Sequence, residues 1–134
     1  MANAIYPKWK EQILQGGANS SLAGTVKVLL IDTGTYTYSA THVFVSDVAG
    51  ASIISRSAAL GSKTYTSGLF VAGTATFSAV TGAQSEALIL YIDTGVDSTS
   101  RLVEYKDTGI GNMPVTPNGG DITVTWNGSG IFQL

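Results

Sequence analysis

The two strongest apolar runs of the chain lie at residues 25–31 (T-V-K-V-L-L-I) and 88–92 (L-I-L-Y-I), and each is followed directly by Asp-Thr-Gly. Apart from Lys27, the first run is continuously apolar, whereas a strand with one solvent-facing side would alternate polar and apolar residues. This run therefore predicts a strand that is covered on both faces. Asp-Thr-Gly is a natural strand exit, because the Asp side chain caps a turn and Gly permits a positive φ.

A helical period replaces the strand pattern only near the N-terminus, over residues 4–15. Ile5, Trp9 and Ile13 recur every four positions and form a single apolar stripe. Pro7 is tolerated in the first turn, and two consecutive glycines end the helix. A helix of about ten residues is marginal alone, so its stripe is expected to pack either on its own domain or on a neighbouring molecule.

From residue 51 the chain has the pattern of short strands separated by Ser-Gly, Thr-Gly, Asn-Gly and Gly-Ser turns. The expected strands are residues 53–60, 64–66, 69–80, 86–93, 102–107, 121–126 and 131–134. The last two are joined by Asn-Gly-Ser-Gly and predict a hairpin. Residues 41–48 fit either a strand or one or two helical turns, and the family resemblance given below favours a short helix.

Several short strands at this spacing predict a mainly β fold, an antiparallel β-sandwich or jelly-roll-like single domain with one short N-terminal α-helix. The length of 134 residues suits one such domain. We divide the chain into an N-terminal helix or arm at residues 1–17 and a β-sandwich domain at residues 18–134.

The composition argues against several functional classes. The sequence has no cysteine and a single histidine, His42, which argues against disulfides, thiolate metal sites and histidine clusters. We expect no secretory signal and no membrane span, because the first residues lack an apolar core and no run reaches about 18 apolar residues. The seven basic residues are dispersed and the net charge is -2, so we expect no nucleic-acid partner.

The charged fraction is the most informative number in the composition. It is 12%, against about 25% in ordinary globular domains. The polar surface is therefore expected to consist mainly of Ser, Thr, Gly and Asn. Such a surface suits a protein that is packed into an assembly, although neutral monomeric β domains also exist.

Asp-Thr-Gly occurs at Asp32, Asp93 and Asp107 and suggests one enzymatic hypothesis. Aspartic proteases resemble this pattern: an apolar strand runs into Asp-Thr-Gly, and two such carboxylates share a proton. The third copy follows Lys106 rather than an apolar run, and the first two are too close in sequence for two protease lobes. We therefore favour strand-terminating turns and keep the protease as a remote alternative.

Two other groups of residues could carry chemistry. Asp93 and Asp97, with the hydroxyls that follow Asp97, could form an oxygen-rich Ca²⁺ loop, but a solvated hairpin loop is the simpler interpretation. His42 lies near Ser39 and Asp47 in sequence, but without a nucleophile-elbow motif a hydrogen-bonded structural histidine is favoured. We predict no catalytic residues, no metal and no cofactor.

Aromatic residues offer a further binding hypothesis. Tyr36, Tyr38 and Trp126 could form a sugar-binding platform, although such residues more often serve packing or an interface.

The opening M-A-N-A-I-Y-P-K-W-K-E-Q-I-L resembles a family of small tailed-bacteriophage proteins that begin M-A-N-A-I-Y-P-K and continue into a short helix. The similarity continues in V-L-L-I-D-T-G-T-Y-T-Y-S-A-T-H-V-F-V-S-D-V at residues 28–48. It returns in F-S-A-V-T-G (77–82), Q-S-E-A (84–87) and P-V-T-P-N-G-G-D-I-T-V-T-W (114–126). These segments cover most of the chain in order, and the resemblance implies a virion structural protein that is not an enzyme.

The resemblance and the low charge lead to one functional hypothesis: a capsid decoration (cement) protein that clamps neighbouring coat subunits. The absence of cysteine fits folding in the host bacterial cytoplasm before assembly into the virion. The expected partners are the major capsid protein or other virion proteins, and a homo-oligomer, a trimer by analogy with three-fold capsid positions, is expected. A tail, neck or fibre-associated component is the alternative. The candidate interface residues are Ile5, Trp9, Ile13, Tyr36 and Tyr38.

Overall fold

Antiparallel strands dominate the computed structural model, which describes residues 3–134 of the chain. The strands are β1 (Ala4–Ile5), β2 (Val26–Ile31), β3 (Ile53–Arg56), β4 (Leu69–Phe70), β5 (Ala75–Phe77), β6 (Ala87–Ile92), β7 (Arg101–Lys106), β8 (Ile122–Val124) and β9 (Phe132–Gln133). The helices are α1 (Pro7–Gln15) and three 3-10 turns, η1 (Val45–Asp47), η2 (Gly50–Ser52) and η3 (Thr66–Gly68). The predicted fold class, a mainly β, antiparallel, sandwich-like domain with one short helix near the N-terminus, is confirmed.

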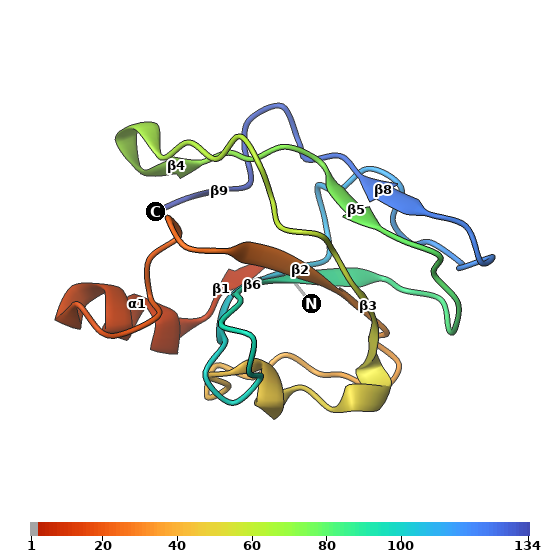
Figure 1. Ribbon diagram of the computed structural model, residues 1–134, viewed down its shortest axis with the longest axis horizontal. Coiled ribbons are helices and arrows are strands. Elements are labelled where there is room, and N and C mark those ends of the chain that lie inside the picture. The colour runs from red at the N-terminus through yellow and green to blue at the C-terminus, as the bar shows by residue number, and fades with distance from the viewer. Residues whose placement is uncertain (1–2) are drawn as a thin grey trace.

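Five strands form the main sheet in the order β1-β7-β6-β2-β3. Two short ribbons, β4 with β9 and β5 with β8, form a layer above this sheet, and the loops that carry η1 and η2 lie below it (Figure 1). The segment after β3 joins the layers. Its Leu60 amide donates to the Val26 carbonyl of the sheet, and its Ala58 amide donates to the Thr76 carbonyl of the ribbon layer.

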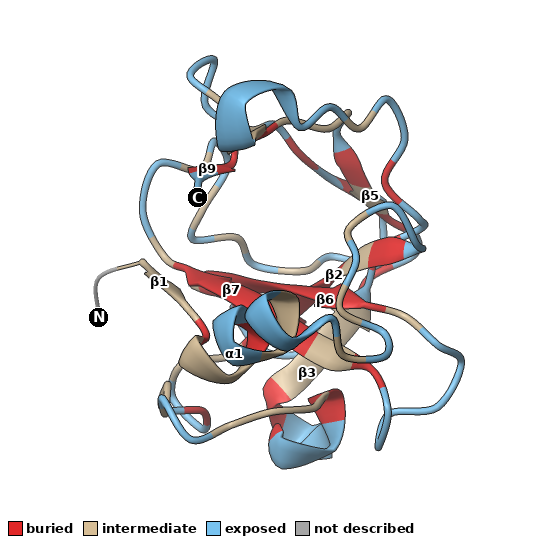
Figure 2. Ribbon diagram, turned by 90° about the vertical axis from the view of Figure 1, so that its left-hand side faces the viewer, coloured by how far each residue is buried: buried red, intermediate tan, exposed pale blue. Residues whose placement is uncertain are grey.

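The core is centred on β2, β6 and β7, where almost every residue is buried (Figure 2). Phe70 and Phe77 of the ribbons are buried above the sheet, and Val45 and Val48 of the loops are buried below it. Each such side chain contributes about 1.5–3 kcal/mol when it is removed from water. The prediction that the apolar run at 25–31 is covered on both faces is confirmed.

Helix α1 begins at Pro7, not at residue 4 as the periodicity predicted. Proline restricts the residue before it to extended backbone, and Tyr6 accordingly has φ -64 and ψ 121. Ile5 therefore belongs to β1, where it pairs with Glu104 of β7, and does not extend the helical stripe. The predicted glycine stop is confirmed: Gly16 has a left-handed φ of 65 and caps the helix.

The apolar side of α1 packs on its own domain. Trp9 is 2% exposed, and its ring meets Phe132 of β9 edge-on with 5.8 Å between ring centroids. Its indole Nε1 donates to the Ser20 carbonyl at 2.9 Å. Of the two alternatives for the helix, the structure therefore shows the intramolecular one.

The predicted hairpin between residues 121–126 and 131–134 is wrong. β8 pairs with β5, and β9 pairs with β4, so the two segments belong to different ribbons. The chain diverges between them because Trp126 donates from its indole nitrogen to the Gly73 carbonyl, whereas the Ile131 amide donates to the Phe70 carbonyl. The side chains of residues 122–125 alternate as in a strand with one covered face, since Ile122 and Val124 are buried and Thr123 and Thr125 are exposed.

Long predicted strands are shorter than expected. The run at 69–80 is divided into β4 and β5, and the run at 53–60 forms a strand only at Ile53–Arg56. Residues 41–48 contain the short helical turn that the resemblance favoured, as η1. The Asp47 side chain fixes this turn by accepting from the amides of Val43 and Phe44.

Candidate functional site

The candidate interface residues are divided between two surface features. Trp9 and Ile13 line an apolar groove beside α1, and Tyr36 and Tyr38 line a polar cavity below the sheet. Ile5 lies in β1, where it is partly buried against the core. The structure therefore does not bring all five residues into one surface, and whether any of them contacts a partner stays a prediction.

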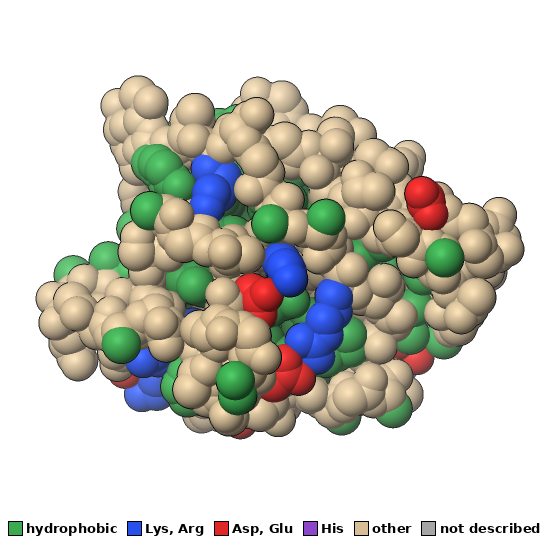
Figure 3. Space-filling view, in the orientation of Figure 1, with side chains coloured by type: hydrophobic (Ala, Val, Ile, Leu, Met, Phe, Trp, Pro, Cys, Tyr) green, Lys and Arg blue, Asp and Glu red, His purple; other side chains and the backbone are tan. Residues whose placement is uncertain are grey.

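The apolar groove, defined by Trp9, Ile13, Leu22, Tyr65, Phe70 and Leu134, consists of two adjoining depressions of about 300 and 100 Å³. Trp9 is buried at its base, whereas Leu134 at the C-terminus is 59% exposed and Tyr65 is 45% exposed. In Figure 3 apolar side chains reach the surface between β4 and α1, among mainly uncharged groups. This groove is suited to binding an apolar segment of another protein.

Hydrogen bonds to the Leu22 carbonyl give the groove a fixed wall. The Leu22 carbonyl accepts from the Tyr65 hydroxyl at 2.9 Å and from Lys63 Nζ at 2.9 Å, and Lys63 also binds the Gly24 carbonyl. The Tyr65 ring in turn stacks on Phe70 with 5.8 Å between centroids. The glycine- and serine-rich linker is thus held against the ribbon layer, and the groove is largely formed in advance of any binding.

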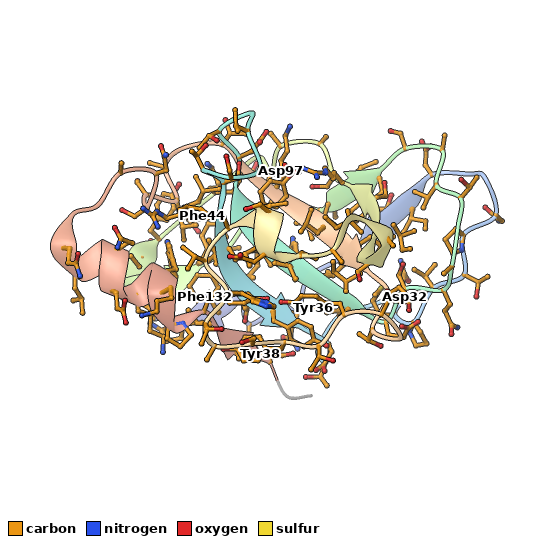
Figure 4. All side chains as sticks on the ribbon, turned by 90° about the horizontal axis from the view of Figure 1, so that it is seen from below. Asp32, Tyr36, Tyr38, Phe44, Asp97 and Phe132 are labelled. Carbon is orange, nitrogen blue, oxygen red and sulfur yellow. The ribbon has the colours of Figure 1, made fainter. Side chains whose placement is uncertain are left out.

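The second feature is a group of tyrosines below the sheet. The hydroxyls of Tyr6 and Tyr36 lie 2.8 Å apart, and the Tyr36 hydroxyl lies 2.9 Å from Nδ1 of His42. Tyr38 packs against both Tyr6 and Tyr105, with ring centroids 5.0 and 5.7 Å apart. Figure 4 shows Tyr36 and Tyr38 close together on this side, with Asp97 toward another edge. The Tyr36–His42 contact confirms a hydrogen-bonded histidine.

These rings open onto a cavity of about 540 Å³, which we call the tyrosine cavity; its lining includes Tyr36, Tyr38, Tyr105, Glu86 and Asp107, with threonine hydroxyls, a methionine and a proline. Glu86 is held in place, because one of its carboxylate oxygens accepts from the amide and hydroxyl of Thr33 at 3.0 and 2.9 Å. Burial, followed by the nearby Asp107 carboxylate, raises the pKa of Tyr105 to about 12. Burial also raises the pKa of Tyr36, so both hydroxyls are neutral at physiological pH.

The Asp-Thr-Gly turns do not form a carboxylate pair between the two better copies. β2 and β6 are antiparallel, with Ile31 opposite Ala87 and Val26 opposite Ile92, so Asp32 and Asp93 follow opposite ends of the strand pair. Asp93 instead forms an ion pair with Lys27 at 2.8 Å. Both aspartates accept from the amide of the glycine two residues on, as expected for strand-terminating turns.

The other proposed constellations are also separated. Asp93 and Asp97, the carboxylates of the candidate Ca²⁺ loop, bind Lys27 and Arg56 respectively. Within residues 3–134, no three His, Asp or Glu side chains gather as a metal site would require. The Asp47 carboxylate holds backbone amides rather than the His42 ring, so the Ser-His-Asp arrangement is not formed.

Sequence reasoning missed several residues of both features. Glu86 and Tyr105 of the tyrosine cavity and Tyr65 and Leu134 of the groove were not singled out, and Asp107 was noted only as the third Asp-Thr-Gly copy. The signal that could have found Glu86 and Asp107 is their position at strand ends, because an antiparallel order of the three central strands places these ends together.

No protein-family model matches this chain, and no curated protein matches it significantly. None of the helices in residues 3–134 has the length and apolar character that a membrane crossing requires. The bacteriophage resemblance therefore stays a prediction from the sequence motifs.

Proposed function

We propose that this chain is a bacteriophage virion structural protein, a capsid decoration protein that binds coat subunits and stabilises the head. The mechanism is burial of surface across neighbouring subunits and involves no chemical step. The motifs at residues 1–14, 28–48 and 114–126 support the family, and the apolar groove supports the mode of binding.

The single observation that carries the mode of binding is the apolar groove with exposed Leu134 and Tyr65 at its rim. Large apolar side chains are normally buried in a free monomer, and a concave apolar surface marks a contact site. Here the groove is formed by segments from the N-terminal helix, the linker, β4 and the C-terminus, which are held together by the core. A segment of a coat subunit that fills it would bury apolar area on both partners.

The distribution of charge supports the same proposal. Only 12% of the residues are charged, and Lys8 and Arg56 are paired with acidic neighbours at 3.1 and 2.7 Å. A surface with few charges costs less to desolvate when it meets another subunit, and neither of these two cations would be buried without a carboxylate. A homo-oligomer, with a trimer as the specific form, is part of the proposal.

The first experiment is the copy number of this protein in purified particles, measured as a ratio to the major coat protein. A ratio near one, or a simple fraction of it, supports decoration. A ratio lower by about an order of magnitude favours the tail, neck or fibre-associated alternative. Absence from particles would overturn both structural proposals.

A pair of variants tests the groove itself. Leu134→Asp places a charge at the groove rim, and because Leu134 is 59% exposed the core is left intact. Its incorporation into particles should fall about tenfold or more, since a buried unpaired carboxylate is costly. Val96→Asp is the matched control: Val96 is 56% exposed in the loop between β6 and β7, outside the groove, and this variant should be incorporated normally.

A further inference from the structure

Three carboxylates lie at the same end of the main sheet. Asp32 directly follows β2, Glu86 directly precedes β6, and Asp107 directly follows β7. The register places these ends together, because Ile31 is opposite Ala87 and Leu88 is opposite Lys106. This end of the sheet therefore carries three acidic side chains that come from separate segments of the chain.

The tyrosine cavity opens at this end and adds aromatic rings to the carboxylates. Glu86 and Asp107 line it together with Tyr36, Tyr38 and Tyr105, and no Lys or Arg side chain of residues 3–134 does so. The face of a tyrosine ring attracts a cation through its quadrupole, independently of any carboxylate. The cavity thus combines two separate features that favour positive charge.

Two basic side chains nearer to the other end of the sheet form ion pairs. Lys27 binds Asp93 at 2.8 Å, and Arg56 binds Asp97 with both guanidinium nitrogens at 2.7 and 2.8 Å. Figure 3 shows basic and acidic side chains next to each other near the middle of the face that it presents. These short ion pairs hold Lys27 and Arg56 at that end, away from the tyrosine cavity.

We infer that the tyrosine cavity binds a guanidinium or ammonium group, an Arg or Lys side chain presented by a protein partner. The free oxygen of Glu86 would accept a charge-assisted hydrogen bond while the partly exposed ring of Tyr38 covers the cation. The identification of that partner as a coat subunit rests on the proposed function. A metal ion is a poorer fit, because no cluster of three or more His, Asp or Glu ligands occurs among the described residues.

The cavity has the dimensions and chemistry for such a side chain. A volume of about 540 Å³ accommodates a guanidinium with its methylene stem. The stem is apolar and would contact the methionine and proline of the lining, while the charged head reaches Glu86. Glu86 is pre-positioned for this, since Thr33 already fixes its other oxygen through two hydrogen bonds.

The test is an NMR titration of the full chain with N-acetyl-arginine methylamide, using the isosteric citrulline derivative as the neutral control. Arginine should shift the amide resonances of Tyr38, Glu86 and Thr108, and citrulline should bind about tenfold more weakly or not at all. Shifts of equal size with citrulline, or with glucose, would overturn the inference. No shift at millimolar arginine would overturn it as well.

Variants locate the binding and exclude a general charge effect. Glu86→Gln keeps an oxygen that accepts from Thr33, so the fold is retained, but it should lower arginine affinity about tenfold. Tyr38→Leu should also weaken binding, by removing a ring of the cavity. Asp97→Asn changes the net charge by the same amount as Glu86→Gln but lies outside the cavity, and it should bind arginine normally. If Asp97→Asn and Glu86→Gln lost arginine affinity equally, net charge alone would explain the effect, and the inference would be overturned.

The result of the arginine titration can be distinguished from the result that tests the proposed function. Copy number in particles tests decoration without reference to the cavity, and the titration uses isolated protein. Arginine binding by a protein that is absent from particles would overturn decoration alone, whereas a decorating protein that does not distinguish arginine from citrulline would overturn the cavity assignment alone.

Discussion

Glu104 and Lys106 lie two residues apart on β7, both buried, with Lys106 Nζ 3.7 Å from one Glu104 carboxylate oxygen. Lys106 also donates to the Ile131 carbonyl at 2.8 Å and so ties the C-terminal segment to the sheet. The second oxygen of Glu104 has no hydrogen-bond partner among the described residues. A carboxylate in this position is costly when charged, because one long ion pair only partly replaces its hydration.

Glu104 predicts a fall in stability toward alkaline pH. Burial raises the pKa of Glu104 from 4.5 to about 7, although Lys106 partly opposes the shift. Because its folded-state pKa is raised, Glu104 stays protonated in the folded protein at pH values where it ionises in the unfolded chain. Its contribution to stability is therefore complete below the unfolded pKa and is lost as pH rises through the folded pKa. The free energy of unfolding should therefore fall by about 1–3 kcal/mol between about pH 5 and pH 8, as measured by urea denaturation.

Glu104→Gln provides the control for that prediction. The amide cannot ionise, so the fall in stability across this pH range should largely disappear. Glu11→Gln alters an exposed carboxylate paired with Lys8 and should leave the fall unchanged. An equally steep decline in Glu104→Gln would show that another group is responsible.

Trp9→Ala should destabilise the isolated monomer by about 3–5 kcal/mol, because it removes a buried ring and leaves a cavity against Phe132. Leu14 lies on the same helix and is 88% exposed, so Leu14→Ala should change the free energy of unfolding by less than about 0.5 kcal/mol. Chemical denaturation of both variants measures the difference. A stable Trp9→Ala monomer that no longer joins particles would instead identify α1 as an arm for a neighbour.

The central strands could be predicted from the sequence because their signal is local. Apart from Lys27, residues 25–31 and 88–92 are continuously apolar, and such runs are typical of a strand covered on both faces. The helix stop was equally local, since Gly16 needs only its own backbone freedom. The helix start was misplaced because the 3.6-residue period of the apolar residues was given more weight than the restriction that Pro7 places on Tyr6.

The pairing of the C-terminal strands could not be predicted from a local sequence signal. Asn-Gly-Ser-Gly is a strong turn signal, but a turn does not determine whether the strands beside it pair with each other. Here β4 and β5 offer partners to β9 and β8, and burial of Phe132 against Trp9 favours that arrangement. The tyrosine cavity was missed for a related reason, since Tyr36, Glu86 and Tyr105 meet only once the strand register is known.

Gly130 is predicted to be intolerant of substitution. Its φ is +99, and an added Cβ would lie 2.8 Å from Leu69 Cδ1 and 3.3 Å from the Phe70 carbonyl oxygen. Gly130→Ala should therefore cost about 1–3 kcal/mol of stability by thermal or urea unfolding. Gly128, in the same loop, has nothing within 4 Å of an added Cβ, so Gly128→Ala should be close to neutral. Equal effects at both positions would contradict the arrangement of the β4–β9 ribbon.

The two matching Asp-Thr-Gly turns should respond differently to the same substitution. Asp32→Asn keeps an oxygen that accepts from the Gly34 amide at 2.8 Å, so its stability should change little. Asp93→Asn keeps the equivalent bond to the Gly95 amide but loses the ion pair with Lys27, which should cost about 0.5–1 kcal/mol because the pair is partly exposed.

The difference between the two variants should also depend on pH. Lys27 is the main cause of the lowered pKa of Asp93, so this stabilisation is present above the unfolded pKa and is lost as pH falls through the folded pKa. The stabilities of wild type and Asp93→Asn should therefore converge in acid. A shared-proton pair of Asp32 and Asp93 would require the two substitutions to act alike. Their opposite positions on β2 and β6 predict that they do not.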